Sequence, residues 1–307
     1  MKVLDKFSDF PKKQYVVLTI GFFDGVHFGH QKILNRIVEI AAAHNGVSAV
    51  LTFWPHPRFV LNKQPEDLKL LTTFSEKEQL IADQHINYLV RIPFTKEFSQ
   101  FSSQKFIQEI LVEGLGVNKL VIGYDHHFGH NREAGFEYLR DNSFRFGFEV
   151  EGIPAQDIDN IAVSSTKIRS ALTDGNMKTS FDYLGRPYSI KGKVVAGRKI
   201  GRKLGFPTAN IEVAEQYKLI PADGIYAVMV SVNSDSYKGM LYIGPRPTLN
   251  GVNRTIEVNI FDFDEDIYGR EIAIDFIRQI RKDSKFSDLN LLKEQLIKDR
   301  QEALKML

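Results

Sequence analysis

Residues 21–30 carry the side chains and glycines best suited to phosphate chemistry. They read Gly-Phe-Phe-Asp-Gly-Val-His-Phe-Gly-His, follow the apolar run 15–20 and open a segment, 31–44, with apolar residues at helical spacing. A glycine-rich turn between a strand and a helix lets backbone approach a ligand, and the helix N-terminus offers free N–H groups and partial positive charge. His27 and His30 add donors at the same end. The pattern predicts a triphosphate site that stabilises charge at an α-phosphate; a simple turn with two surface histidines is the alternative.

Further polar clusters follow other predicted strands of the first half. Pro55-His56-Pro57 comes after the run 47–53, and Gly123-Tyr124-Asp125 comes after the run 117–122. Because the carboxyl ends of parallel strands meet at one edge of a sheet, these loops are expected to lie beside residues 21–30. A metal site on the histidines of the second loop is the weaker alternative, since adjacent histidines rarely reach one ion; these are His126, His127 and His130.

Residues 164–169, Ser-Ser-Thr-Lys-Ile-Arg, form the last cluster of the first half. Ser164 or Ser165 is expected to cap a helix that runs toward Leu172. The cluster also predicts a second phosphate-binding site, formed by hydroxyls, helix N–H groups, Lys167 and Arg169. This role is compatible with capping of the helix.

The second half has a different kind of site. Residues 192–205 are basic and contain recurring glycines, which predicts a flap over a triphosphate. Thr208 and Asn210 lie two apart on an extended segment, point to the same side and offer oxygen ligands for a hard cation such as Mg²⁺. Glu257 alternates with apolar neighbours on the predicted strand 255–263. It is either a solvent-facing glutamate or the carboxylate that accepts a proton from a substrate hydroxyl.

Two kinds of element must position these groups. The first half alternates strand-like runs with helical stretches, which predicts a parallel sheet covered by helices; the runs are 15–20, 47–53, 86–92, 117–122 and 146–153, and the helices 31–44, 75–84 and 103–114. The second half has strand-like runs without crossover helices, which predicts an antiparallel barrel followed by a helix; the runs are 188–195, 225–232, 238–243, 255–263 and 271–278, and the helix 288–304. Turn signals at 174–176 and 185–187 place the domain boundary near 185, giving domains 1–184 and 185–307.

Composition narrows the class of protein. The chain has 307 residues, a net charge of +2 and no cysteine, which excludes disulfides, thiolate metal sites and a cysteine nucleophile. The N-terminus has no apolar stretch of signal length, and no run of about 18 apolar residues occurs. We expect a soluble, cytoplasmic protein with no nucleic-acid partner and no membrane association.

The motifs, in their order, resemble the bacterial bifunctional riboflavin kinase/FAD synthetase family over essentially the whole chain. The first half resembles its FMN adenylyltransferase module through 21–30, 55–57, 123–129 and 164–169. The second half resembles its flavokinase module through four segments, which are 205–210, 224–226, 243–248 and 257–263. The resemblance implies a Rossmann-like α/β nucleotidyltransferase domain and a flavokinase-like antiparallel β-barrel with a C-terminal helix. It implies that riboflavin and ATP give FMN in the barrel, and that FMN and a second ATP give FAD and pyrophosphate in the first domain.

The resemblance also implies roles for individual residues. His27 and His30 stabilise charge on the α-phosphate, and Glu257 acts as base on the ribityl hydroxyl. ATP of the adenylyltransferase is bound by Gly21, Phe23, Asp24, Gly25, His27, Gly29, His30, Asp125, Gly129, Ser164, Ser165, Thr166 and Arg169. ATP of the kinase is bound by Gly192, Gly197, Gly201, Lys203, Gly205, Pro207, Thr208 and Asn210, of which Thr208 and Asn210 hold Mg²⁺. Flavin is bound by His56, Pro57, Glu257 and Arg281.

Two positions depart from the family pattern. Thr52 stands where the family often has asparagine, which bears on flavin affinity of the first site. Asn259 stands where histidine is common and faces the same way as Glu257, so it is a candidate to tune the base. The rival hypotheses are a chain in which one module alone works, a flavin-binding protein without catalysis, and nucleic-acid binding by the basic stretch, which lacks interleaved aromatics.

Overall fold

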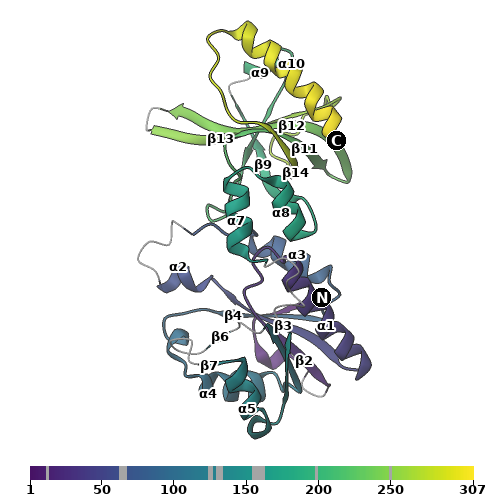
Figure 1. Cartoon of the computed structure of the whole chain (residues 1–307), viewed down its shortest axis with the longest axis vertical. Helices are drawn as coiled ribbons and strands as arrows, with labels where there is room; N and C mark the ends of the chain where they lie inside the picture. The colour runs from purple at the N-terminus through teal and green to yellow at the C-terminus, as the bar shows by residue number, and fades with distance from the viewer. Residues whose placement is uncertain are drawn as a thin grey trace. The chain divides into compact units, whose positions relative to one another are not determined.

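The chain divides into two compact units, Met1–Ser165 and Thr166–Leu307. The computed structural model describes residues 1–11, 14–61, 68–123, 127–128, 134–153, 163–197, 200–248 and 251–307 (Figure 1). The predicted domains differ from these units by the segment 166–184, which the contacts assign to the second unit. Among the described residues, no helix is long and apolar enough to cross a membrane.

The first unit is built on a six-stranded parallel sheet, which confirms the predicted Rossmann-like α/β fold. The strand order is β1-β4-β3-β2-β5-β8. The strands are β1 (Lys2–Leu4), β2 (Val16–Ile20), β3 (Val47–Trp54), β4 (Tyr88–Pro93), β5 (Lys119–Gly123) and β8 (Glu149–Ile153). β2 pairs with β3 on one side and β5 on the other, so the order reverses at β2, the place where such sheets bind ligands. Sequence analysis missed β1, which has three residues.

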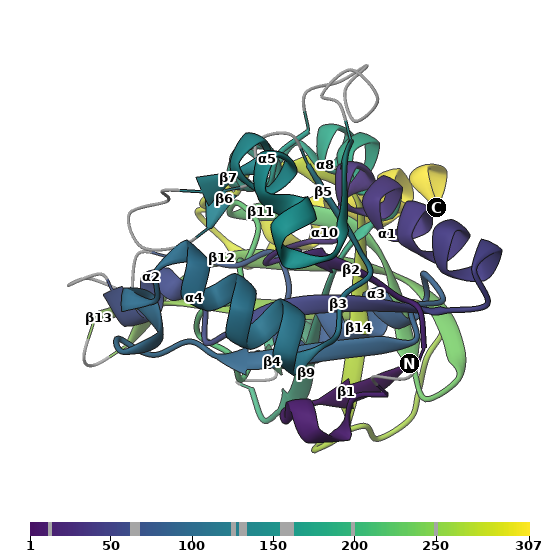
Figure 2. The same cartoon turned by 90° about the horizontal axis from the view of Figure 1, so that it is seen from below.

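Helices cover both faces of this sheet (Figures 1 and 2). They are α1 (Phe28–Ala43), α2 (Pro57–Leu61), α3 (Phe74–Ala82), α4 (Ser103–Phe106) with the π-helix η4 (Ile107–Gly114), and α5 (Phe136–Phe146). Ile33, Leu34 and Ile37 of α1 pack with Val17 and Val50 on one face. On the other face, residues of α4, η4 and α5 pack with the remaining side chains of the strands. Smaller elements are the 3-10 turns η1 (Phe7–Asp9) and η3 (Phe98–Gln100) and the pair β6 (His127–Phe128) and β7 (Ala134–Gly135).

The predicted helix 103–114 is only partly α-helical. From Ile107 the backbone adopts i→i+5 hydrogen bonding, as in the bond from Leu115 N to Ile110 O of 3.0 Å. A hydrophobic repeat specifies which side of a helix is buried, and it does not distinguish α- from π-helical winding over two turns.

The second unit is a closed six-stranded barrel with a C-terminal helix, as predicted. The order is β10-β13-β12-β11-β14-β9, with all pairs antiparallel. The strands are β9 (Tyr188–Val195), β10 (Ala209–Glu212), β11 (Gly224–Val232), β12 (Asp235–Thr248), β13 (Gly251–Ile260) and β14 (Glu271–Arg281). The helices are α7 (Ser165–Thr173), α8 (Met177–Leu184), α9 (Ile200–Lys203) and α10 (Leu289–Met306).

Helix α8 lies between the two turn signals that sequence analysis used for the boundary. Asn176 caps it by accepting a hydrogen bond from Thr179 N, and Gly185 ends it with φ of 73°. Both residues are therefore helix caps, which explains why turn-forming residues flank a helix that was not predicted.

Helix α10 is anchored to the barrel by a buried ion pair. Asp288 caps the helix by accepting from Asn290 N and Leu291 N. Arg281 at the end of β14 donates to both carboxylate oxygens of Asp299 at 2.8–3.1 Å, and Asp299 is 1% exposed. The pair ties the last strand to the last helix.

We expect Asp299→Asn to lower the free energy of unfolding by about 1.5–3 kcal/mol, because it leaves a largely buried guanidinium without its counter-ion. The control is Glu302→Gln, which removes the exposed pair with Lys305 and is expected to cost less than about 0.5 kcal/mol. Urea denaturation followed by far-UV circular dichroism measures both. Equal effects of the two variants would contradict the anchoring role.

Candidate active sites

The loop after β2 brings His27 and His30 together at the start of α1. His27 is the residue before the helix, and the two imidazole rings stack with centroids 3.6 Å apart and planes 17° apart. Phe23 and Val26 have positive φ values of 51° and 40°, which side chains rarely adopt and which place the loop under strain. The strained turn delivers both histidines to the helix N-terminus, where sequence analysis placed them.

His30 is a neutral imidazole in this environment. Burial lowers its pKa well below the usual value of 6.5, and the nearby charges of His27 and Lys77 lower that pKa further. Its Nδ1 is buried and has no hydrogen-bond partner among the described residues. An orphaned polar atom at a helix N-terminus is available to a ligand, and a bound polyphosphate would raise the pKa of this ring.

Asp24 holds the same loop against the segment before α3. Its carboxylate accepts hydrogen bonds from Leu71 N at 2.9 Å, Thr72 N at 3.1 Å and Thr72 Oγ1 at 3.3 Å. Ser165 Oγ donates to the carbonyl oxygen of Asp24 at 2.9 Å. Two predicted ATP ligands that are far apart in the sequence are therefore in contact. Asp24 therefore positions the loop, whereas its own contact with ATP stays a prediction.

The remaining predicted ligands of the first site divide into three groups. Gly21, Gly25 and Gly29 lie on the loop or in the first turn of α1, as the pattern indicates. Asp125 and Gly129 lie outside the described residues, as do the alternative metal ligands His126 and His130. Ser164 precedes α7, and Thr166 and Arg169 belong to the part of α7 in the second unit.

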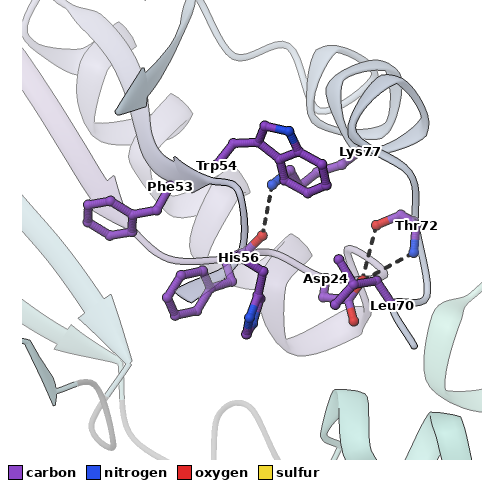
Figure 3. Close-up of a pocket in the computed structure, with 8 residues that line it drawn as sticks. Asp24, Phe53, Trp54, His56, Leu70, Thr72 and Lys77 are labelled. Carbon is purple, nitrogen blue, oxygen red and sulfur yellow. Dashed lines mark hydrogen bonds between the residues drawn. The ribbon is translucent and has the colours of Figure 1, made fainter. Parts of the chain in front are cut away.

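A pocket lies beside this loop at the carboxyl ends of β2 and β3 (Figure 3). It is a shallow, open pocket lined by Phe22, Asp24, Phe53, Trp54, His56, Leu70, Thr72 and Lys77. Phe22 and His56 have ring centroids 4.7 Å apart. His56, predicted to bind flavin, therefore lines an aromatic pocket, whereas Pro57 starts α2 and is not among the lining residues.

The barrel brings the predicted kinase residues together on one side of β10 and β13. Asn210 is the register partner of Glu257, and Thr208, just before β10, donates from Oγ1 to Glu257 Oε2 at 3.1 Å. A hydroxyl, an amide and a carboxylate thus converge, which is an oxygen donor set of the kind Mg²⁺ uses together with nucleotide phosphates. Within the described residues, no cluster of three histidine, cysteine or acidic side chains could hold a metal.

Asn259 lies two residues after Glu257 on β13, on the same side of the strand, and contacts the segment that carries Thr208. Its Nδ2 donates to Pro207 O at 2.6 Å, and its side chain is buried. It therefore holds the segment that carries Thr208. The structure gives Asn259 a contact with the backbone of Pro207, whereas tuning of the base stays a prediction.

The glycines of the basic stretch have packing reasons of their own. A Cβ on Gly197 would lie 2.0 Å from Asn210 Nδ2, so a larger residue here would displace the Asn210 side chain. Gly205 has φ of 87°, which favours glycine in the turn after α9. These contacts place residues 192–197 against the Asn210 segment; coverage of ATP by Gly192, Gly201, Lys203 and their neighbours stays a prediction.

Arg281, predicted to bind flavin, uses its guanidinium for hydrogen bonds within the second unit. Besides the pair with Asp299, its guanidinium donates to Lys282 O at 3.2 Å and to Ser284 Oγ at 2.9 Å. Its donors serve the junction of β14 and α10, and its contact with flavin stays a prediction.

Comparison with known proteins agrees with both halves of this picture. A family model described as FAD synthetase matches residues 9–167, and one described as riboflavin kinase matches residues 184–307. The chain belongs to the bifunctional riboflavin kinase/FMN adenylyltransferase family. It is 37% identical to the protein of that name from Bacillus subtilis, covering 94% of this chain and 92% of the relative, and 39% identical to that from Listeria monocytogenes, covering 97% and 93%. A crystal structure described as a macrolide-efflux protein from Streptococcus pneumoniae shares the fold, with a TM-score of 0.89, 30% identity and coverage of 98% and 97%.

Two residues at these sites were missed from the sequence. Lys77 lies on the apolar face of α3, three residues after Phe74 and four before the buried Ile81, and a lysine at a core position is the signal that could have found it. Tyr242 is the register partner of Glu257 on β12, and burial raises its pKa to about 12, so it remains a neutral phenol. No sequence pattern marks Tyr242, because its importance comes from strand register.

We expect His30 to remain neutral from pH 8 down to pH 6 in the ligand-free protein. Its folded-state pKa lies below the unfolded value of about 6.5, so the unfolded chain takes up more protons below that pH and acidification destabilises the fold. Histidine-ring NMR, with the signal assigned by comparison with His30→Gln, measures the titration, and the protein in urea supplies the reference. A His30 signal that titrates near 6.5 in the folded protein would be incompatible with a buried neutral ring.

Proposed function

We propose that this chain makes FAD from riboflavin in two ATP-dependent steps, each at the site described in one unit. The supporting observation is that the two groups of side chains to which we assign chemistry lie in different compact units: His27 with His30 in the first, and Thr208 with Asn210 and Glu257 in the second. Family membership supports the same pair of activities, riboflavin kinase and FMN adenylyltransferase.

The kinase step forms a bond between the ribityl 5′-oxygen of riboflavin and the γ-phosphorus of ATP, and breaks the bond to ADP. Glu257 accepts the hydroxyl proton and orients the oxygen. Because phosphoryl transfer has a loose transition state, a carboxylate held by the Thr208 hydroxyl is basic enough for this role. The proton therefore leaves through Glu257 Oε1 or Oε2.

The adenylyl step needs no protein base. The FMN phosphate is already ionised near neutral pH, so its oxygen attacks the α-phosphorus of ATP directly and pyrophosphate leaves. The strained loop holds the backbone N–H groups of α1 and the His30 ring where charge builds up on the α-phosphate. His30 contributes as a neutral hydrogen-bond donor, and its basicity rises when the nucleotide binds.

Thr208 and Asn210 fit Mg²⁺, because both offer neutral oxygens beside a carboxylate. Bound with the nucleotide, the cation would supply charge neutralisation at the β- and γ-phosphates. The nucleotide substrates of both steps favour a cytoplasmic enzyme that acts on riboflavin, FMN and ATP without a nucleic-acid or membrane partner.

We expect Glu257→Gln to lower the rate of FMN formation from riboflavin about 10²–10⁴-fold, the usual contribution of a general base, while FAD formation from supplied FMN continues. His30→Ala should do the reverse, so that FMN accumulates. Chromatographic separation of flavins over time measures both steps in one sample, and each variant controls for folding of the other. Loss of both steps in a folded variant would overturn the assignment of the steps to separate sites.

We expect Asn210→Ala to raise the Mg²⁺ concentration for half-maximal kinase rate about tenfold or more, as loss of one ligand weakens the site. Asn290→Ala, at an exposed position of α10, is the matched control within the same unit. A titration of kinase rate against Mg²⁺ at saturating riboflavin gives the answer. An unchanged metal requirement would remove Asn210 from the metal site.

A further inference from the structure

Lys77 is a buried lysine with no carboxylate in ion-pair contact, although the charge of Asp24 acts on it from a longer distance. The residue is 5% exposed, and its Nζ donates hydrogen bonds to Phe22 O and to Thr52 Oγ1, both at 3.3 Å. In the part of the chain that the structure describes, Lys77 forms no ion pair. Two long hydrogen bonds to neutral oxygens leave one of the three ammonium donors and most of the charge unmatched, and burying such a charge is costly.

The ammonium group lies between the two parts of the first site. On one side it stands over the rings of Trp54, 5.5 Å from Nζ to the centroid, and Phe74, 4.9 Å away. It also lines the aromatic pocket together with His56 (Figure 3). On the other side, Nζ donates to the carbonyl oxygen of Phe22, which belongs to the loop between β2 and α1. The positive charge of Lys77 also lowers the pKa of His30.

A buried cation whose charge Asp24 offsets only in part would be stabilised by a bound anion. Adenylyl transfer joins two anions, the FMN phosphate and the ATP triphosphate, and their repulsion has to be offset where they meet. The N-terminus of α1 and His30 already face the position expected for the triphosphate. The pocket side, with Phe22, Phe53 and Trp54, suits the planar flavin, and Lys77 lies at the boundary between them.

We propose that Lys77 binds the 5′-phosphate of FMN and holds this nucleophile against the α-phosphate of ATP. The inference rests on the proposed adenylyl transfer at this site. Nζ keeps its proton throughout: the new bond joins an FMN phosphate oxygen to the α-phosphorus, the bond to the β-phosphate oxygen breaks, and pyrophosphate carries away the charge. Lys77 thereby acts as a substrate-binding residue for the attacking group.

Thr52 holds the Lys77 ammonium group in place through a hydrogen bond. It is fully buried on β3 and accepts one of the two hydrogen bonds of Nζ. The departure from asparagine at this position therefore bears on flavin affinity through Lys77, since the Thr52 side chain lines no part of the pocket.

The test uses the full chain with supplied FMN and ATP, comparing Lys77→Met and Lys77→Arg with the control Lys105→Met, an exposed lysine of the same unit. We expect Lys77→Met to raise the KM for FMN about 10–100-fold, the effect of losing a hydrogen bond to a charged group, with the KM for ATP changed less than about twofold. Lys77→Arg should recover part of the loss. The urea-unfolding midpoint of each variant and its KM for ATP in the adenylyl reaction report that the first unit is folded, and FAD formation by the wild-type chain tests the proposed function itself.

A pH profile adds a readout that a structural role would not move. Burial lowers the pKa of Lys77 to about 8, with Asp24 opposing and Arg91 adding to that shift. The wild-type kcat/KM for FMN should therefore fall above about pH 8, as the ammonium loses its proton, and Lys77→Arg should not show this fall. A rise confined to the KM for ATP, an unchanged KM for FMN in a folded Lys77→Met chain, or a flat wild-type profile between pH 7.5 and 9.5 would each overturn the proposal.

Discussion

Strand β2 is buried along its whole length and pairs in parallel on both sides, and the first active site depends on this constraint. Val16 to Ile20 contribute to the cores on both faces of the sheet. The chain can leave such a strand only at its carboxyl edge, and it must turn within a few residues to begin α1 on one face. The positive φ values at Phe23 and Val26 are the cost of this sharp turn, and Asp24 holds it closed through the backbone of Leu71 and Thr72. The histidines are thus placed by the requirements of the sheet.

The barrel achieves a similar placement by register. Asn210, Glu257 and Tyr242 lie side by side across β10, β13 and β12, because antiparallel partners project to the same side of a sheet. The neighbouring row, with Leu241 and Val258, is buried in the core, so a shift by one residue would bury the polar row instead. The hydrophobic core of the barrel therefore fixes the positions of the predicted kinase residues.

Much of this arrangement could be read from the sequence, because both halves show clear periodicity. Alternating residues around Glu257 and the helical repeat after His30 gave the strands, the helices and the sides on which the polar groups lie. The rest depends on contacts between distant segments. Lys77 meets Thr52 and Phe22, 25 and 55 residues away, and no local pattern encodes that meeting. Gly197 shows the converse case: a Cβ there would displace the Asn210 side chain, whereas the sequence pattern attributed this glycine to a phosphate flap.

The presence of both compact units on one chain fixes their ratio at one to one. Every molecule that phosphorylates riboflavin brings one adenylyltransferase site with it, so changes in the amount of protein alter the two fluxes together. The steady-state level of FMN is then determined by the relative turnover of the two sites and by the demand of flavoproteins for FMN. A substitution that slows one unit therefore changes the proportion of the two cofactors, whereas a change in expression alters their sum.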